Sequence, residues 1–203
     1  DASSLASSKL TGALPAIDGS ALTGVGLSTL VAEDADFGTG QTVSLSLGDH
    51  TQQTFWIHPL KSDLEALRYI QLRLTDGSGT VITGNEYVSQ TEITNSAVTE
   101  IDQDSYFGLE SAGRMIPYPS AVNTMFLTAK IIVNNAKVTT MATIVETQFF
   151  WSNTASPTVQ PAFLLSGKMQ TVEANNHIVF GFTSTTGSPA YASGIKYTSI
   201  GLN

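Results

Sequence analysis

The 203-residue sequence contains no cysteine, which excludes disulfide bonds and thiolate chemistry. Charged residues are also scarce: they make up 13% of the chain, about half of the usual share. Only nine residues are Lys or Arg, against 17 Asp and Glu, and the net charge is −8. Nucleic-acid binding needs basic side chains to neutralise phosphates, so we expect no nucleic-acid partner. No apolar run approaches the ~20 residues of a membrane-spanning helix, so we expect no membrane insertion.

Catalytic motifs are missing as well. The sequence has no Gly-x-Ser-x-Gly, phosphate-binding loop or dinucleotide fingerprint. Its three histidines are His50, His58 and His177, and no neighbouring residue supports them as bases for a nucleophile. His50 and His58 flank a predicted turn and could meet in a hairpin, but a metal site needs further converging ligands. We therefore expect a non-enzymatic protein whose histidines have packing or surface roles.

Gly, Ser and Thr take the place of charge, together with short stretches in which apolar and polar residues alternate. Such alternation, as in Val43, Leu45 and Leu47, indicates strands with one buried face. The sequence predicts strands at 42–48, 53–60, 69–75, 80–83, 122–133, 138–151, 163–172, 177–183 and 195–202. Their spacing favours an all-β fold, an antiparallel jelly-roll-like β-sandwich.

The sequence also predicts which side chains of one strand share a face, and where one turn lies. Phe55 and Ile57 share one predicted face, Trp56 and His58 share the opposite one, and Pro59 ends the strand or places it at a sheet edge. The residues at 76–79 (Asp-Gly-Ser-Gly) are a strong turn signal.

The second half of the chain is less even. Residues 122–133 and 138–151 are expected to pair through a turn at 134–137. Both strands carry apolar residues on both faces, which indicates central strands or a face buried against another subunit. Residues 84–120 are the least patterned part and are expected to form long loops with short strands.

Three segments follow from these patterns. Residues 1–30 are expected to be an extended oligomerisation or anchoring segment, and residues 41–203 the β-sandwich. Between them, residues 31–40 are expected to be a hinge, because acidic residues precede Gly38 and Gly40. A short helical turn at 27–32 is compatible with this interpretation.

The first segment repeats Leu-Thr-Gly at 10–12 and at 22–24 and is rich in small residues. Its apolar side chains stand singly, so one copy cannot bury them and needs neighbouring repeats or identical chains. The residues expected to mediate oligomerisation are Leu10, Leu14, Ile17, Leu22 and Val25.

Two stretches carry a resemblance. Residues 9–26 (KLTGALPAIDGSALTGVG) resemble a short repeat of tail-fibre and other appendage proteins of tailed bacteriophages. Residues 182–203 resemble the closing strands of small phage β-sandwich domains. In the appendage proteins the repeat often precedes a C-terminal β-domain, and the chains are often trimers.

The resemblance implies a homotrimeric, non-enzymatic appendage on the virion surface, such as a tail fibre or receptor-binding protein. It further implies that the N-terminal segment contacts other virion proteins and that several weak sites attach together to a host glycan or protein. Two alternatives stay open: a head fibre or capsid-decorating structural trimer, and a carbohydrate-binding module unconnected with a virus.

Aromatic side chains are the best candidates for ligand contacts, because exposed rings beside polar residues stack on sugars. The candidates are Trp56, Tyr106, Tyr118 and Tyr191. The alternative is that such rings fill the core or a subunit interface, and we favour it for Trp56 and Trp151.

Glu100, Asp102 and Asp104 stand at alternate positions, as at the start of a calcium-binding EF-hand loop. The loop's glycine is replaced by Ser105, and Glu110 comes one residue too early for the closing ligand. Ca²⁺ binding is therefore a weak expectation beside a solvated acidic loop, and no cofactor is expected.

Overall fold

The computed structural model describes residues 28–60, 68–84, 86–93, 96–104, 107–108, 125–153, 163–169, 172–184, 190–191 and 193–203. This part of the chain is all-β, as predicted, and consists of two antiparallel sheets without a helix. None of these residues belongs to a helix long and apolar enough to cross a membrane.

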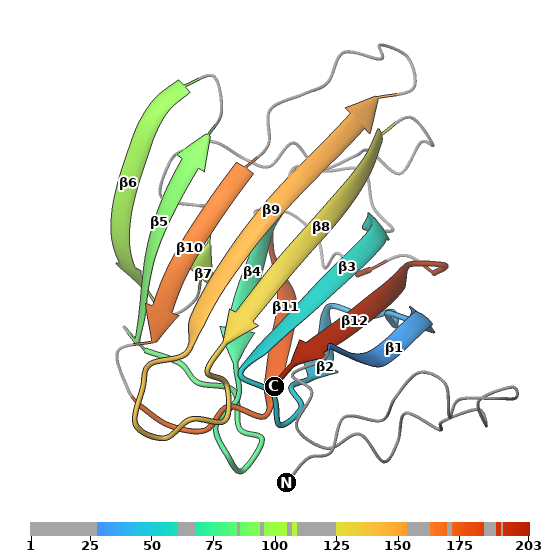
Figure 1. Ribbon diagram of the computed structural model, residues 1–203. Helices are drawn as coiled ribbons and strands as arrows, with labels where there is room; N and C mark the ends of the chain where they lie inside the picture. Colours follow the sequence, from blue (N-terminus) through green and yellow to red (C-terminus); the bar gives the residue numbers. More distant parts are fainter. Residues whose placement is uncertain are drawn as a thin grey trace, which may run out of the picture.

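The larger sheet has eight strands (Figure 1). Their spatial order is β1 (Thr29–Asp36), β12 (Lys196–Leu202), β3 (Gln52–Leu60), β8 (Met125–Asn134), β9 (Ile144–Asn153), β10 (Phe163–Met169), β5 (Tyr87–Ile93) and β6 (Ser96–Asp104). The smaller sheet contains β2 (Thr42–Ser46), β11 (His177–Ser184), β4 (Arg68–Leu74) and β7 (Phe107–Gly108), again in spatial order.

The connections are jelly-roll-like. In the orders β1-β12-β3-β8 and β2-β11-β4-β7, the strands β1 to β4 alternate between the two sheets, and so do β11 and β12 at the end of the chain. These eight strands have the spatial order of a jelly roll, in which eight strands form two Greek keys. Strands β9, β10, β5 and β6 extend the larger sheet beyond β8.

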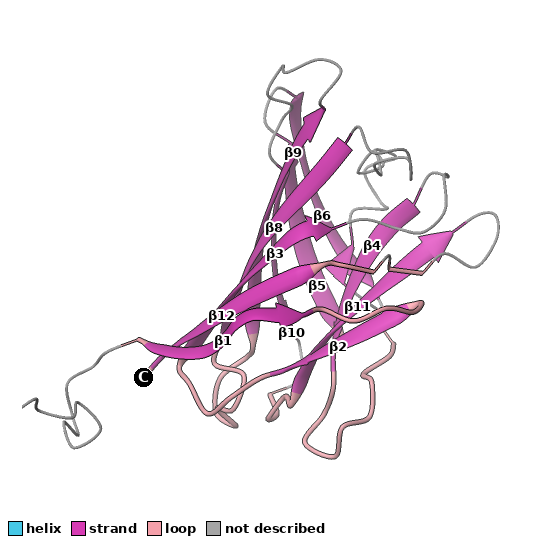
Figure 2. Ribbon diagram, turned by 90° about the vertical axis from the view of Figure 1, so that its right-hand side faces the viewer, coloured by secondary structure: helices cyan, strands magenta, loops and turns pink. Residues whose placement is uncertain are grey.

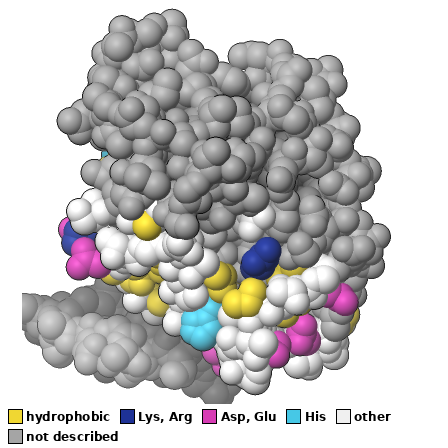
Figure 3. Space-filling model, turned by 180° about the vertical axis from the view of Figure 1, so that it is seen from behind, with side chains coloured by type: hydrophobic (Ala, Val, Ile, Leu, Met, Phe, Trp, Pro, Cys, Tyr) yellow, Lys and Arg dark blue, Asp and Glu magenta, His cyan; other side chains and the backbone are white. Residues whose placement is uncertain are grey.

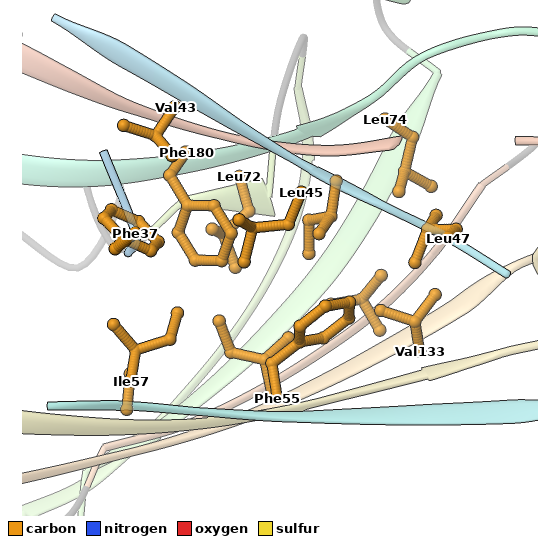
Figure 4. Packing of buried hydrophobic residues seen from close by; sticks show 14 of the residues in the cluster. Phe37, Val43, Leu45, Leu47, Phe55, Ile57, Leu72, Leu74, Val133 and Phe180 are labelled. Carbon is orange, nitrogen blue, oxygen red and sulfur yellow. The ribbon is translucent and has the colours of Figure 1, made fainter. Parts of the chain in front are cut away.

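The core lies between the two sheets, which are seen as two layers in Figure 2. Figure 4 shows Leu45, Leu72 and Phe180 of the smaller sheet opposite Phe55 and Ile57 of the larger one. Each side chain is buried because alternate residues of a strand point to the same face of its sheet.

The predicted faces of the early strands are confirmed. Phe55 and Ile57 are buried, whereas Trp56 and His58 are exposed. Pro59, however, neither ends β3 nor lies at an edge: it occupies an irregularity in the pairing of β3 with β8, between Ile57 and Leu60. A bulge tolerates proline there because the regular ladder of hydrogen bonds is already interrupted.

The expected hinge at 31–40 and the helical turn at 27–32 are corrected by the structure. Residues 31–36 belong to β1, which pairs with β12 from Thr29 opposite Gly201 to Asp36 opposite Lys196. The pattern hides this strand because β1 is an edge strand with two register shifts and mostly exposed residues.

Other boundaries also differ. Strands β8 and β9 pair as predicted, but β9 begins at Ile144, so residues 135–143 form a longer connection. Residues 80–83 contribute a single bridge, Thr75 to Val81. The weakly patterned 84–120 region contains two full strands, β5 and β6, whose polar sequences gave little alternation.

The chain enters the sandwich at the end where β12 leaves it. Thr29 pairs with Gly201, and Gln52 at the start of β3 pairs with Leu202. Residues 1–27 therefore join the domain beside the end of the last strand, and the domain extends away from this junction.

Candidate functional site: the outer face of the larger sheet

The outer face of the larger sheet is the side turned away from the core. The register places its residues in rows that cross neighbouring strands, because residues directly opposite each other point to the same side. We define the apolar row as Leu30, Ile200, Thr54 and Ile132, which are successive register partners on β1, β12, β3 and β8. Three of these four side chains are large and aliphatic.

The apolar row is accessible at its outer end. Leu30 is 53% exposed, and Ile200 and Ile132 are half-buried. Thr54 in the middle is nearly covered by its neighbours. A sheet face turned to solvent normally carries polar residues, so this row is the unusual feature of the face.

Trp56 lies in the next row, two residues along β3 from Thr54. Its register partners are Thr198 on β12 and Lys130 on β8, and Gln148 follows on β9. The indole is 37% exposed. An exposed ring among a hydroxyl, an ammonium and an amide can stack on a sugar or anchor a protein contact.

A polar row closes the face beyond Trp56. Lys196 forms an ion pair of 2.6 Å with Asp36, and this hydrogen bond raises the pKa of Lys196. His58, the register partner of Lys196, has its Nδ1 atom 2.7 Å from the hydroxyl of Thr128. These contacts surround Trp56 with polar groups on the side away from the apolar row.

The smaller sheet has a different outer face. Thr42, Ser44 and Ser46 of β2 are exposed there. Figure 3 shows this side of the molecule, where uncharged polar side chains and backbone (white) are interspersed with hydrophobic ones (yellow).

A second candidate is a pocket of about 350 Å³ at the end where the chain enters. It is lined by Asp49, His50, Thr51, Lys137, Val138 and Asn203. The Nδ1 atom of His50 lies 2.7 Å from Oδ1 of Asn203. Lys137 donates a hydrogen bond to Oδ1 of Asn176, and burial lowers the pKa of Lys137 although Asp49 opposes the shift. The pocket offers hydrogen-bond donors and acceptors to a small polar molecule.

Tyr191 was predicted to contact a ligand, but the structure buries its side chain. Its side chain is 1% exposed and packs edge-to-face on Phe37, with ring centroids 5.1 Å apart. Its hydroxyl lies 3.4 Å from the carbonyl oxygen of Gly181. The ring therefore fills the core, which the proline and small residues around it in the sequence did not indicate.

The other predicted site residues divide into two groups. Trp56 is exposed, in agreement with its predicted face. Trp151 lies in β9, but its side chain is outside the described set. The remaining residues lie wholly outside the described part of the chain: Tyr106, Tyr118, Leu10, Leu14, Ile17, Leu22 and Val25.

The weak metal candidates are not brought together by any described contact. Glu100, Asp102 and Asp104 lie in β6, but their side chains are outside the described set. Among the described side chains, no three His, Asp or Glu converge on a common point. His50 precedes β3 and His58 lies near the other end of this strand. The expectation that the two rings meet in a hairpin is therefore wrong.

Sequence reasoning missed the apolar row, although part of its signal was present. Apolar residues on both faces of 122–133 included Ile132, which indicated a second buried or covered face. Leu30 and Ile200 carry no such signal, because their proximity depends on the pairing of β1 with β12. No protein-family model, curated protein or solved structure matches this chain.

Proposed function

We propose that the protein is a non-enzymatic bacteriophage virion appendage whose β-sandwich is presented in three copies and attaches to the host surface. The observation that carries the proposal is the placement of the chain's entry. The N-terminal segment joins at one end of the sandwich, where Thr29 pairs with Gly201. The resemblance of residues 9–26 to the repeats of phage appendage proteins supports a trimer on the virion.

A domain attached at one end presents its opposite end and its sides to the surroundings. Three such domains on one stalk bind a surface together, and a weak single-site affinity then gains from the high effective concentration of the remaining copies. In this proposal the N-terminal segment contacts other virion proteins, and the ligand is a glycan or protein of the host surface.

Immunogold labelling of phage particles with an antibody against the sandwich tests this location. We expect label at the tail tip, and the purified protein should reduce adsorption of the phage to host cells in proportion to its concentration. Label on the head would instead support the alternative of a head fibre or decorating trimer. Absence of label from intact particles would contradict a virion role.

A carbohydrate-binding module is the second candidate. Two observations favour it: the jelly-roll-like order also occurs in lectin domains, and Trp56 is exposed beside Lys130 and Gln148. A glycan array probed with the native protein and with Trp56→Ala tests this function. Binding that Trp56→Ala abolishes would support it, whereas binding unchanged in the variant would exclude the Trp56 face as the sugar site.

A further inference from the structure

We infer that the outer face of the larger sheet is the surface through which copies of this chain contact one another, with the apolar row at its centre. The inference rests on the proposed multimeric presentation and adds the site of contact. The sequence-based expectation placed oligomerisation in residues 1–30, which share only Leu30 with the apolar row; the rest of this surface belongs to later strands of the sandwich.

The first argument is the continuity of the apolar row. Leu30, Ile200 and Ile132 come from strands distant in sequence and are connected through Thr54 by direct register pairing. Two more exposed aliphatic side chains, Leu202 and Ile144, lie in the neighbouring row through Gln52 and Asn134. Contiguous exposed apolar surface on a soluble domain typically marks a contact with another molecule.

The second argument identifies the occupant. Leu30 lies two residues after Ser28, the first described residue, so the chain enters the sandwich at the outer end of the apolar row. The segment proposed to join the copies thus delivers each neighbouring chain to this row. A second copy is therefore the partner that the chain itself brings closest.

The third argument is charge. Lys130 and Lys196 offset two of the three carboxylates described at this face, which are Asp34, Asp36 and Glu146, so the described charges sum to −1. The whole chain carries −8. Like charge therefore opposes the approach of two copies only weakly at this face.

The face alone is too small to hold a trimer together. Four rows along β3 span about 20 Å and the five strands from β1 to β9 span about 24 Å, on the order of 500 Å² for each copy. Three copies that share this face would bury about 500 Å² in total for each pair, below the ~1,000 Å² of a specific interface. We therefore expect the face and the N-terminal segment to act together, with Trp56 as an aromatic anchor at the border of the apolar row.

Cysteine labelling tests the contact without disturbing the core, because the native chain has no cysteine. Leu30→Cys and Met141→Cys are matched variants, since the native side chains are 53% and 50% exposed. In the assembled full chain, we expect a maleimide to modify Cys at position 30 at least about ten times more slowly than at position 141. Equal rates would overturn the inference.

Charge insertion provides the second test. Light scattering coupled to size exclusion should show a trimer for the native full chain and for Met141→Asp. Leu30→Asp should raise the concentration at half-dissociation by about tenfold or more, because a charge buried in an interface lacks a partner. A thermal melt of each variant verifies that the sandwich is folded.

The outcomes separate the inference from the proposed function. A trimer that Leu30→Asp leaves unchanged would place the contacts outside the apolar row, for example in residues 1–27; this overturns the inference and leaves the appendage proposal standing. A native chain that is monomeric at all concentrations would overturn the inference and the trimer together. Virion location and host adsorption are measured independently, by immunogold labelling and adsorption competition.

Discussion

The imidazole of His50 lies directly against the backbone of Gly201. A Cβ atom added to Gly201 would stand 2.3 Å from Cδ2 of the ring and 2.4 Å from its Cγ and Nε2 atoms. The same ring is close to Gly48, where an added Cβ would be 2.8 Å from Cδ2. His50 thus connects the turn between β2 and β3 to the last strand, and its Nδ1 contact with Asn203 fixes the ring.

Gly201→Ala should destabilise the sandwich by about 1–3 kcal/mol, because the new methyl group overlaps His50 and forces the ring or β12 to move. Gly181→Ala is the matched control: Gly181 is also a strand glycine, and the atom nearest to an added Cβ is in the Thr42 methyl group at 3.8 Å. Urea unfolding monitored by circular dichroism measures both. A Gly201→Ala variant as stable as Gly181→Ala would contradict the steric account.

The same clash predicts non-additivity. If His50 is the obstacle, His50→Ala should recover most of the stability that Gly201→Ala loses, because the ring is no longer there to be displaced. Unfolding free energies of both single variants and the double variant complete the cycle. Strictly additive losses would show that Gly201→Ala acts through some contact other than His50.

Tyr87→Phe should cost about 1–3 kcal/mol of unfolding free energy. The Tyr87 hydroxyl accepts a hydrogen bond from the backbone N–H of Leu74 at 3.0 Å and donates one to the carbonyl of Ile82 at 3.1 Å. The side chain is buried, so water does not replace the lost partner. Chemical denaturation at neutral pH measures the difference, and a change below about 0.5 kcal/mol would be inconsistent with it.

The same residue predicts a loss of stability at alkaline pH. Burial raises the pKa of Tyr87 to about 12, above its ordinary value of 10.0. The folded state retains the proton where the unfolded state loses it, so the stabilisation is complete below pH 10 and disappears as pH rises to about 12. Unfolding titrations should therefore show the difference between native and Tyr87→Phe chains shrinking over this range. A constant difference would rule out Tyr87 as its source.

The ionised carboxylate of Asp76 should stabilise the folded state, and this stabilisation should disappear at acidic pH. Its Oδ1 atom accepts hydrogen bonds from the Ser78 hydroxyl at 2.7 Å and from the backbone N–H groups of Ser78 and Thr80 at 2.8 Å. The Ser78 hydroxyl bond is the main cause that lowers the pKa of Asp76 below 3.8. The stabilisation is present above pH 3.8 and is lost as pH falls through the lower pKa of the folded state.

Asp76→Ala should accordingly lower the melting temperature at neutral pH, and the difference from the native chain should diminish as the pH falls below 3.8. Asp49→Ala is the control, because its exposed carboxylate forms none of the hydrogen bonds described for Asp76. Melting curves at several pH values would refute the prediction if both variants behaved alike.

Asn175 should be the most sensitive residue of the loops at the entry end. It is fully buried, accepts a hydrogen bond from the Thr143 hydroxyl at 2.6 Å and donates one to the carbonyl of Thr75 at 3.0 Å. Asn175→Ala removes both bonds and leaves only longer ones, from the Asn176 N–H to the Thr75 carbonyl at 3.3 Å and from the Thr143 hydroxyl to the Asn135 carbonyl at 3.4 Å. It should cost about 2–3 kcal/mol. Asn176→Ala, at a more accessible neighbouring residue, should cost less. Equal unfolding free energies for the two variants would disprove the ranking.

The sequence by itself determined the features that local chemistry specifies. The alternation of Val43, Leu45 and Leu47 fixed a buried face because successive residues of a strand point to opposite sides. The turn after Asp76 formed where predicted, because Asp and Gly satisfy a tight turn within a few residues. The all-β class and the pairing of β8 with β9 followed from the same short-range signals.

Only the tertiary structure decided which distant residues meet. Leu30 lies opposite Ile200, and Gly201 lies under His50, because β12 inserts between β1 and β3. Tyr191 is buried by Phe37, although neither sequence context indicates a core position. Strand order and register depend on the joint packing of both sheets, and a period of two within a single strand contains no information about its neighbour.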